Sequence, residues 1–367
     1  MFAARILLAM GIRVALIGTG NCGGLALRQL IEDDRFDLTG VWVNSQAKVG
    51  KDAGELARLD ATTGVTATGD MDAIVAAAPD CAVYCAMGDV RPKEALADVR
   101  GLLEAGINVV GSSPGFLAYP WGVIPDRAID RVQVAAQLGN ASLFVTGVDP
   151  GFVTDLLPLA LASTCRSIEQ IRTMEIADYA TYDGATVMFD VMGFGNEIGD
   201  LPFLYQPGML SAAWGVAIRQ LAAGLGLEVD EIRDFVEQEP APEDFDVAVG
   251  RITKGTVAAV RFRIEGFVAG RPAIVVEHIT RLRGDLRPDW AQPAQAGGSY
   301  RVEITGEPSY VMDVSPTSRN GDHNYAAILA AAGRIVNAIP DVVAAAPGIR
   351  TTLDLPLVTG SGVYRRR

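Results

Sequence analysis

The chain has 367 residues, 49% of them hydrophobic and 20% charged, and its formal net charge at pH 7 is −13. That length is typical of two domains, and that apolar content is enough for two ordinary cores. The acidic balance, with no Lys/Arg run longer than Arg365 to Arg367, argues against a nucleic-acid partner.

The first ten residues, Met1 to Met10, are apolar, but Arg5 interrupts them and no small-residue cleavage site follows. They therefore predict no secretory signal. No run of about 18 apolar residues occurs, so no membrane association is expected. The four cysteines are scattered, and we expect a soluble, reduced, cytoplasmic protein.

An apolar strand runs into a glycine-rich turn and then into helix-forming sequence between Ile12 and Leu30. Gly18, Gly20 and Gly23 have the G-x-G-x-x-G spacing of a dinucleotide-binding turn. The first glycine allows the tight turn, the second lets a pyrophosphate approach the backbone, and the third lets the helix pack closely on the strand. The phosphates would then lie at the N-terminus of the helix.

Strand and helix signals alternate up to about residue 145, as a doubly wound parallel sheet requires. Further strands are predicted at Leu38 to Val43, Cys81 to Ala86, Ile107 to Val110 and Ser142 to Val145, with helices such as Pro92 to Ala105 between them. In such a sheet the ligand lies beyond the carboxyl ends of the strands, so the loops after them should converge on one crevice. We expect a Rossmann domain over residues 1–146.

The loop after the second strand, Val43 to Lys48, contains no carboxylate. A carboxylate there would bond the ribose 2′-hydroxyl of NAD, whereas Asn44, Ser45 and the ammonium of Lys48 suit the 2′-phosphate of NADP. NADP is therefore favoured and NAD is possible, unless this is an ordinary solvated loop. The residues predicted to bind the cofactor are Gly18, Gly20, Asn21, Cys22, Gly23, Asn44, Ser45, Lys48, Met87, Gly88, Ser112, Ser113, Pro114 and Asp149.

After residue 150 the pattern changes to longer strands, several of them alternating. Strands are predicted at Ile168 to Glu175, Val257 to Phe267, Ala273 to Leu282 and Ser299 to Ile304, and helices at Phe152 to Ala162, Ser211 to Leu225 and Tyr325 to Ala338. The pattern predicts a second α/β domain with a mixed sheet over residues 147–336. Pro340 to Pro356 is expected to be irregular, and residues 337–367 to return to the first domain.

Gly111 to Gly115 matches the G-x-S-x-G pattern of serine hydrolases. That mechanism uses the backbone N–H of the residue after the serine as an oxyanion donor, and Pro114 has none. A loop facing the cofactor is the preferred interpretation. With only two histidines, His278 and His323, and no CxxC pair, we predict no metal site.

His278 lies in an alternating strand, where it could face a pocket as an acid or base, or be a satisfied buried imidazole. Asp178, Thr181 and Tyr182 follow the first strand of the second domain. They either line the substrate site or form a polar edge of the sheet.

Several motifs together resemble the 2,4-diaminopentanoate dehydrogenase and amine dehydrogenase family, which is distantly related to dihydrodipicolinate reductase. They are the glycine turn, Val49 to Gly54, Leu117 to Pro120, Gly147 to Phe152, Met192 to Gly195, Asn337 to Pro340 and Pro347 to Ile349. The resemblance implies reversible hydride transfer between NAD(P)H and an imine carbon, so that a carbonyl compound and ammonia become an amine. It also implies a homodimer with the pocket between the two domains.

The chain departs from this family in two places. Members carry a glutamate just before the Leu-x-Tyr-Pro stretch, and that place falls on Gly115 or Phe116, neither of which titrates. Where relatives tend to have asparagine the chain has Asp149, which could act as the acid or hold the carboxamide of the cofactor. We predict Asp149 and His278 as catalytic residues. The predicted substrate pocket consists of Gly115, Phe116, Phe152, Asp178, Thr181 and Tyr182.

The predicted function is an NADP-preferring oxidoreductase of the amine dehydrogenase type, acting on a small apolar ketone or aldehyde with ammonia. Phe116, Trp121 and Phe152 near the expected crevice favour an apolar substrate, and no arginine pair is evident there to bind a carboxylate. Two alternatives stay open. One is a reductase of carbonyl, C=C or C=N bonds that needs no ammonia, and the other is a nucleotide-binding sensor without chemistry.

Overall fold

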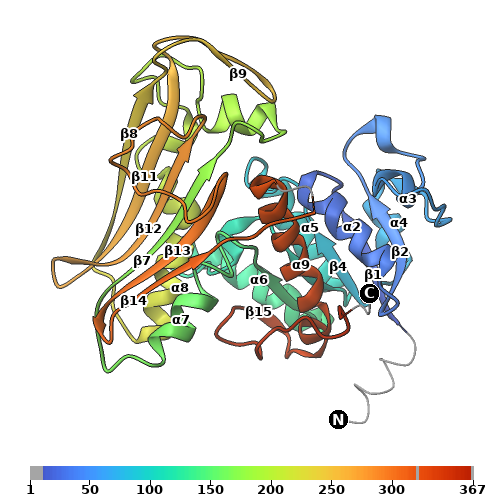
Figure 1. The fold of residues 1–367 in the computed structure, drawn as a ribbon. Helices are drawn as coiled ribbons and strands as arrows, with labels where there is room; N and C mark the ends of the chain where they lie inside the picture. The colour runs from blue at the N-terminus through green and yellow to red at the C-terminus, as the bar shows by residue number, and fades with distance from the viewer. Residues whose placement is uncertain (1–10, 320–321, 365–367) are drawn as a thin grey trace. The chain divides into compact units, whose positions relative to one another are not determined.

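The computed structural model describes residues 11–319 and 322–364. Met1 to Met10, for which no secretory signal is predicted, lie outside the described residues. The chain divides into two compact units, one formed by residues up to Val148 and from Ile328 onward, and the other by Asp149 to Ala327. In Figure 1 the first unit is blue to cyan and dark red, and the second is green to orange.

The first unit contains a seven-stranded parallel sheet in the order β15–β6–β5–β4–β1–β2–β3. Its strands are β1 (Ile12–Ile17), β2 (Phe36–Trp42), β3 (Ala67–Thr68), β4 (Cys81–Tyr84), β5 (Asn108–Gly111), β6 (Ser142–Val145) and β15 (Gly348–Arg350). Its helices are α2 (Asn21–Glu32), α3 (Ala53–Leu56), α4 (Met71–Ala76), α5 (Pro92–Glu104) and α6 (Asp126–Gly139), with short 3-10 turns η1 (Gln46–Lys48) and η2 (Gly115–Leu117). The strand order reverses at β1, which is the Rossmann arrangement. Because β15 pairs with β6, the C-terminal segment returns to this sheet, and the predicted fold class is confirmed.

Strand β1 is buried along nearly its whole length. Val14 and Leu16 belong to the same apolar core as Leu27 of α2 and Ile335 of α9. Full burial of such a side chain contributes about 1.5–3 kcal/mol. This core therefore fixes the end of β1 and the start of α2, between which the glycine turn lies.

The second unit contains a six-stranded mixed sheet in the order β14–β13–β7–β12–β11–β8, and a two-stranded sheet of β9 and β10. The strands are β7 (Ser167–Asp178), β8 (Glu231–Pro240), β9 (Phe245–Val247), β10 (Gly250–Ile252), β11 (Val257–Val268), β12 (Arg271–Arg281), β13 (Gly298–Glu307) and β14 (Tyr310–Val314). The helices are α7 (Leu156–Ala162) and α8 (Met209–Leu225), with a π turn η3 (Thr186–Val191) and a 3-10 turn η4 (Phe203–Tyr205). Strands β7 and β12 are parallel, and the other neighbours in the six-stranded sheet are antiparallel.

The two faces of this six-stranded sheet differ, because successive residues of a strand point to opposite faces. Helix α8 covers one face, and the ring centroids of its Trp214 and of Phe262 in β11 are 5.0 Å apart. The other face carries Glu277, which is fully buried. Its carboxylate accepts hydrogen bonds from Arg172 Nε at 2.7 Å and Arg261 Nε at 2.6 Å.

Helix α9 (His323–Ala344) corrects the prediction for the C-terminal part of the chain. We expected residues 340–356 to be irregular, but Pro340 lies inside this helix. A proline in a helix interior costs about 3 kcal/mol, and full burial of Ile339 and Val342 in the core of the first unit offsets that cost. In the described part of the chain, α9 is the one helix that is long and apolar enough to cross a membrane by those two criteria. Its buried side chains pack as those of a core helix do.

Two other boundaries differ from the prediction. Helix α7 begins at Leu156 rather than Phe152, since the side chain of Asp155 accepts a hydrogen bond from the Leu156 N–H and caps the helix there. Strand β7 runs on to Asp178, so Glu175 lies inside the strand rather than at its end.

Candidate active site

The glycine turn after β1 has the geometry that a dinucleotide requires. Gly18 has a φ of +93°, which favours glycine, and a Cβ there would lie 2.7 Å from the backbone nitrogen of Ala86. A Cβ on Gly23 would lie only 1.9 Å from the carbonyl oxygen of Gly18. A Cβ on Gly20 would meet nothing within 4 Å. The fold therefore requires Gly18 and Gly23, whereas a glycine at position 20 is explained by a ligand that approaches the backbone.

Helix α2 begins directly after this turn, at Asn21, and no side chain caps it. The backbone N–H groups and the helix dipole at such an N-terminus favour a phosphate. The turn and the start of α2, with Gly20, Asn21 and Cys22, therefore fit the pyrophosphate of NAD(P).

Backbone hydrogen bonds join the first residue after a strand to the last residue of the neighbouring strand, and they do so for four strands in a row. The Gly18 N–H donates to the Trp42 carbonyl at 2.9 Å, and the Cys85 N–H to the Ile17 carbonyl at 2.8 Å. The Ser112 N–H donates to the last carbonyl of β4 at 3.2 Å. The residues predicted to bind the cofactor after β1, β2, β4 and β5 thus lie along one edge of the sheet.

Lys48 connects the loop after β2 to the glycine turn. Its Nζ donates to the carbonyl of Thr19 at 2.8 Å and to the Thr19 Oγ1 at 3.0 Å. Asn44 and Ser45 in the same loop are exposed. The structure therefore presents one ammonium and two neutral side chains where the ribose of a dinucleotide lies in this fold.

Ser113 and Asp89 join the loops after β4 and β5. The Ser113 Oγ accepts from the Gly88 N–H at 2.8 Å and donates to Asp89 Oδ2 at 3.1 Å. Asp89 Oδ1 accepts from the Gly115 N–H at 2.8 Å. An exposed carboxylate therefore lies beside Gly115, close to the place where the resemblance puts the family's glutamate. Met87, in the same loop, is also exposed.

The side chains of Cys22, Cys85 and Ser112 are hydrogen-bonded to one another. The hydrogen bond between the two thiols lowers the pKa of Cys22 and raises the pKa of Cys85. Since Cys85 follows β4 and Ser112 follows β5, this group supports the start of α2 from the sheet.

In the second unit, a row of side chains crosses four strands. Tyr300 of β13 pairs with Glu175 of β7, Glu175 with His278 of β12, and His278 with Phe262 of β11. Residues directly opposite each other in neighbouring strands point to the same face of a sheet. The four side chains, which we call the Glu175 row, therefore lie side by side on the face that α8 covers.

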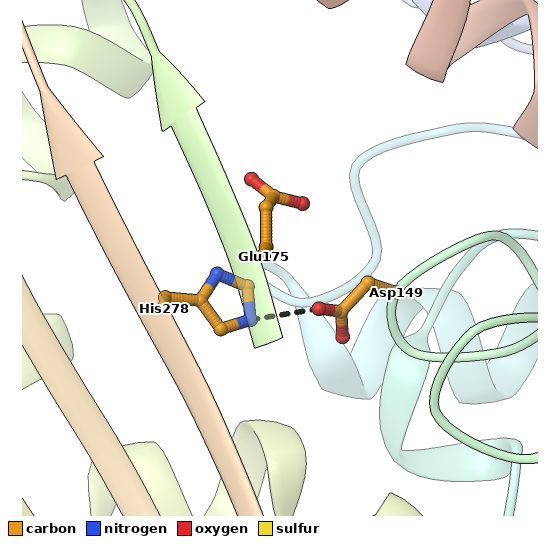
Figure 2. A group of neighbouring side chains, drawn as sticks. All are labelled: Asp149, Glu175 and His278. Carbon is orange, nitrogen blue, oxygen red and sulfur yellow. Dashed lines mark ion pairs between the residues drawn. The ribbon is translucent and has the colours of Figure 1, made fainter. Parts of the chain in front are cut away.

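Asp149, the first residue of the second unit, lies against this row, as Figure 2 shows. Its Oδ2 is 2.9 Å from Nε2 of His278, and its Oδ1 accepts a hydrogen bond from Trp214 Nε1 at 3.0 Å. The side chains of His278 and Asp149 are only 6% and 3% exposed. The separation is that of a hydrogen bond, and the two groups form an ion pair when the imidazole is protonated.

The environment of His278 favours its charged form. Burial alone would lower the pKa of this imidazole, but the charge and hydrogen bond of Asp149, together with the negative charges of Glu175 and Glu277, outweigh burial and raise the pKa above the usual value. The ring also stacks on Phe262, with centroids 4.5 Å apart. A buried imidazolium next to a carboxylate can give a proton to a bound substrate and take it back.

Glu175 lies beside His278 and Asp149 (Figure 2). It accepts a hydrogen bond from the Tyr179 hydroxyl at 2.6 Å and another from Tyr300. Burial raises the pKa of both phenols, which therefore stay protonated and donate. One ligand atom from each of Asp149, Glu175 and His278 lies within 4.8 Å of the others, and two carboxylates with an imidazole are also a set that can hold a divalent metal ion.

Among the residues predicted to line the substrate pocket, Tyr182 is joined to this group, because it stacks on Tyr179 with ring centroids 5.1 Å apart. Asp178 and Thr181 instead contact the start of α9. The Asn324 Nδ2 donates to the Asp178 carbonyl at 2.9 Å and to the Thr181 Oγ1 at 3.0 Å. Gly115 and Phe116 belong to η2 of the first unit, and Phe152 to the second.

The sequence analysis did not single out Glu175, Tyr300 or Trp214. A signal for Glu175 existed, since its carboxylate stands directly between the apolar residues Met174 and Ile176 at the end of a predicted strand. Its neighbours across the sheet depend on strand register, which one sequence does not contain.

Comparisons with known proteins agree with the resemblance. The sequence family described as the 2,4-diaminopentanoate dehydrogenase C-terminal domain matches residues 152–363. The chain is 39% identical to an amine dehydrogenase from Streptomyces virginiae over 97% of this chain and 99% of that protein. It is 26% identical to the 2,4-diaminopentanoate dehydrogenase of Acetoanaerobium sticklandii over 94% of each chain.

Among solved structures, that of an amine dehydrogenase from Mycobacterium smegmatis has the same fold. The TM-score is 0.77 at 21% identity, over 96% of this chain and 97% of that one. Together with the extent of the sequence matches, this shows that the chain belongs to the amine dehydrogenase and 2,4-diaminopentanoate dehydrogenase family of oxidoreductases, which use a nicotinamide cofactor and act on CH–NH2 groups.

Proposed function

We propose that this enzyme converts a small, largely apolar ketone or aldehyde and ammonia into a primary amine, and catalyses the reverse oxidative deamination. The observation that carries the proposal is the buried group of Asp149, Glu175 and His278 among aromatic side chains. Two carboxylates and one imidazolium leave one negative charge, which suits the protonated nitrogen of an amine or iminium. A cofactor bound at the glycine turn would supply or accept the hydride.

Asp149 and His278 are the proposed catalytic pair. During amination the hydroxyl of the carbonyl adduct must leave as water, which requires a proton. The imidazolium of His278 can supply that proton, and Asp149 keeps the imidazole charged and oriented. A positioned acid of this kind typically contributes a factor of about 10² to 10⁴ in rate.

The surroundings support an apolar substrate. Phe262 and Trp214 pack against His278. The guanidinium of Arg281 is buried, but it donates to the carbonyls of Leu286 and Ala291 at 2.8 and 3.0 Å rather than facing a ligand. We retain the six predicted pocket residues, Gly115, Phe116, Phe152, Asp178, Thr181 and Tyr182, as part of this proposal.

We propose NADP as the preferred cofactor. Lys48, held at the glycine turn by Thr19, supplies a positive charge, and the loop from Val43 to Lys48 contains no carboxylate to repel a 2′-phosphate. The homodimer implied by the family and the cytoplasmic location expected from composition stay predictions.

The direct test is oxidation of NADPH at alkaline pH with a panel of small ketones and aldehydes, each with and without ammonium chloride. We expect turnover only where ammonium is present. Turnover without ammonium would support the ammonia-independent reductase, and NADPH binding without any turnover would support the sensor. The family relatives favour neither of these alternatives.

A further inference from the structure

The side chains around Glu175 carry one more negative than positive charge. His278 and Asp149 form an ion pair and cancel each other. Tyr179 and Tyr300 are neutral donors, and burial lowers the pKa of His323, so its imidazole is neutral near pH 7. Glu175 is 8% exposed, and in the described part of the chain no cation of its own pairs with it. A buried carboxylate without a cation costs several kcal/mol, which makes the group a place for a cationic ligand.

Buried polar atoms without a hydrogen bond flank the Glu175 row on the same face of the sheet. Thr173 Oγ1 and Thr280 Oγ1 lie two residues along from Glu175 and His278 in β7 and β12. Both threonines are fully buried, and neither hydroxyl has a partner within the described protein. Nδ1 of His323 is likewise without one in the described part of the chain. Buried polar groups are normally hydrogen-bonded, so their concentration here indicates the place of a small polar ligand.

We propose that Glu175 is a further catalytic residue, which binds the nitrogen of the substrate and accepts its proton. This inference rests on the proposed amine dehydrogenase function. The family's glutamate falls on Gly115 or Phe116 in this chain, neither of which can accept a proton, and Glu175 takes that role. An ionised carboxylate has about four acceptor positions. The hydroxyls of Tyr179 and Tyr300 occupy two of them, so an N–H of ammonium or of a protonated amine can be bound at another.

The proposed step balances in the direction of amine oxidation. An N–H bond of the protonated primary amine breaks and an O–H bond forms on Glu175, which leaves the neutral amine. The carbon that bears the nitrogen then loses a hydride to the oxidised nicotinamide that the enzyme's activity requires, and the substrate becomes a protonated imine, the iminium ion. Water adds to the iminium carbon, and one of its protons passes to the nitrogen, which leaves as ammonia. The other proton of the water goes to solvent as the carbonyl forms, and Glu175 returns its own proton to ammonia or solvent.

Asp89 is the rival for this role, because it lies beside Gly115. Like Glu175, it already accepts two hydrogen bonds, here from the Gly115 N–H and the Ser113 hydroxyl, and burial raises the pKa of its carboxyl. Both donors belong to the loop after β5, whereas Glu175 lies beside the pair of His278 and Asp149 and beside the threonines without partners. Asp89 therefore fits a role in joining two loops, while Glu175 fits a role in binding a cationic nitrogen.

The test is Glu175→Gln, which keeps the shape of the side chain and removes its charge. We expect kcat/KM for ammonium to fall by about 10²- to 10⁴-fold and the acidic limb of its pH profile to be lost. NADPH affinity, measured by fluorescence, should not change. A second readout needs no turnover. Methylammonium chloride should raise the melting temperature of the parent enzyme more than sodium chloride does at equal ionic strength, and this difference should vanish in the variant.

Glu277→Gln is the matched control, because it removes a buried carboxylate from the neighbouring strand on the opposite face. It should lower the melting temperature and leave the KM for ammonium unchanged. Should Glu175→Gln fail to fold, Glu175→Asp keeps the charge, and the methylammonium effect should persist in it at a reduced turnover rate.

The inference is overturned if Glu175→Gln keeps the kcat/KM for ammonium and the pH profile of the parent enzyme. It is also overturned if Asp89→Asn, and not Glu175→Gln, loses kcat/KM for ammonium and the acidic limb of the profile. If EDTA abolishes turnover and Zn²⁺ or Mn²⁺ restores it, then Asp149, Glu175 and His278 bind a metal ion, and the inference is likewise overturned. If the parent enzyme shows no ammonium-dependent turnover, the proposed function fails. The methylammonium measurement then decides on its own whether Glu175 binds a cationic nitrogen.

Discussion

Three alanine substitutions in the glycine turn should separate what the fold requires from what the cofactor requires. In Gly23→Ala the new Cβ would lie 1.9 Å from the Gly18 oxygen, so strand and helix must move apart, at a cost of about 1–3 kcal/mol. In Gly24→Ala, one residue further along α2, the nearest atom would be 4.0 Å away. That variant should gain about 1 kcal/mol from helix propensity. In Gly20→Ala the Cβ would meet nothing, and the apo-protein should lose less than about 1 kcal/mol.

Thermal unfolding and NADPH titration together measure these effects. At about 2–4 °C per kcal/mol for a domain of this size, Gly23→Ala should melt roughly 4–8 °C below the parent protein if it loses about 2 kcal/mol. Gly20→Ala should melt near the parent but bind NADPH about 5- to 150-fold more weakly, the equivalent of 1–3 kcal/mol. Normal NADPH binding by Gly20→Ala, or parent-like stability of Gly23→Ala, would refute the assignment of these glycines.

Two further predictions concern single side chains. Asp149→Asn should lower the free energy of unfolding by about 3 kcal/mol at pH 6. The pKa of folded His278 is raised above its usual 6.5, so the ion pair stabilises fully below pH 6.5 and is lost as pH rises through the folded pKa. The difference in urea unfolding between parent and variant should therefore shrink at alkaline pH, and a difference independent of pH would contradict the ion pair. Lys48→Ala should weaken NADPH binding by about tenfold, the loss of one partly exposed phosphate contact, and leave NADH binding nearly unchanged. An equal loss for both cofactors would show that Lys48 only supports the glycine turn.

The first unit was largely predictable because its signals are local. An apolar run such as Ile12 to Ile17 is buried on both faces, and the glycine turn that follows has a fixed spacing with a physical reason for each residue. Strand β6 was predicted at its observed bounds, Ser142 to Val145. The fold class followed from this alternation.

The second unit was less predictable because its organisation is not local. Strand β8, Glu231 to Pro240, is an edge strand with alternating exposed residues and many charges, and its sequence carries little apolar signal. The helix through Pro340 was missed because burial of neighbouring side chains outweighed a local penalty. His278 could be proposed from its strand, but its ion pair with Asp149 joins positions 129 residues apart (278 minus 149). Glu175 becomes a candidate only when its pairing with His278 and Tyr300 is known.

The Glu175 row has a consequence for how substrate range can change in this family. Its neighbours on the same face are two further rows, each set off by two residues, or roughly 7 Å, along the strands. One row is small, with Gly298, Ala177 and Thr280, and the other is larger, with Val302, Thr173 and Val276. Point substitutions at Ala177 and Thr280 would change the space beside Glu175 in graded steps, whereas a Cβ at Gly298 would lie 2.4 Å from the ring of His323. An insertion or deletion of one residue in β7 would turn Glu175 to the opposite face, so new specificities should arise here by substitution and not by changes in strand length.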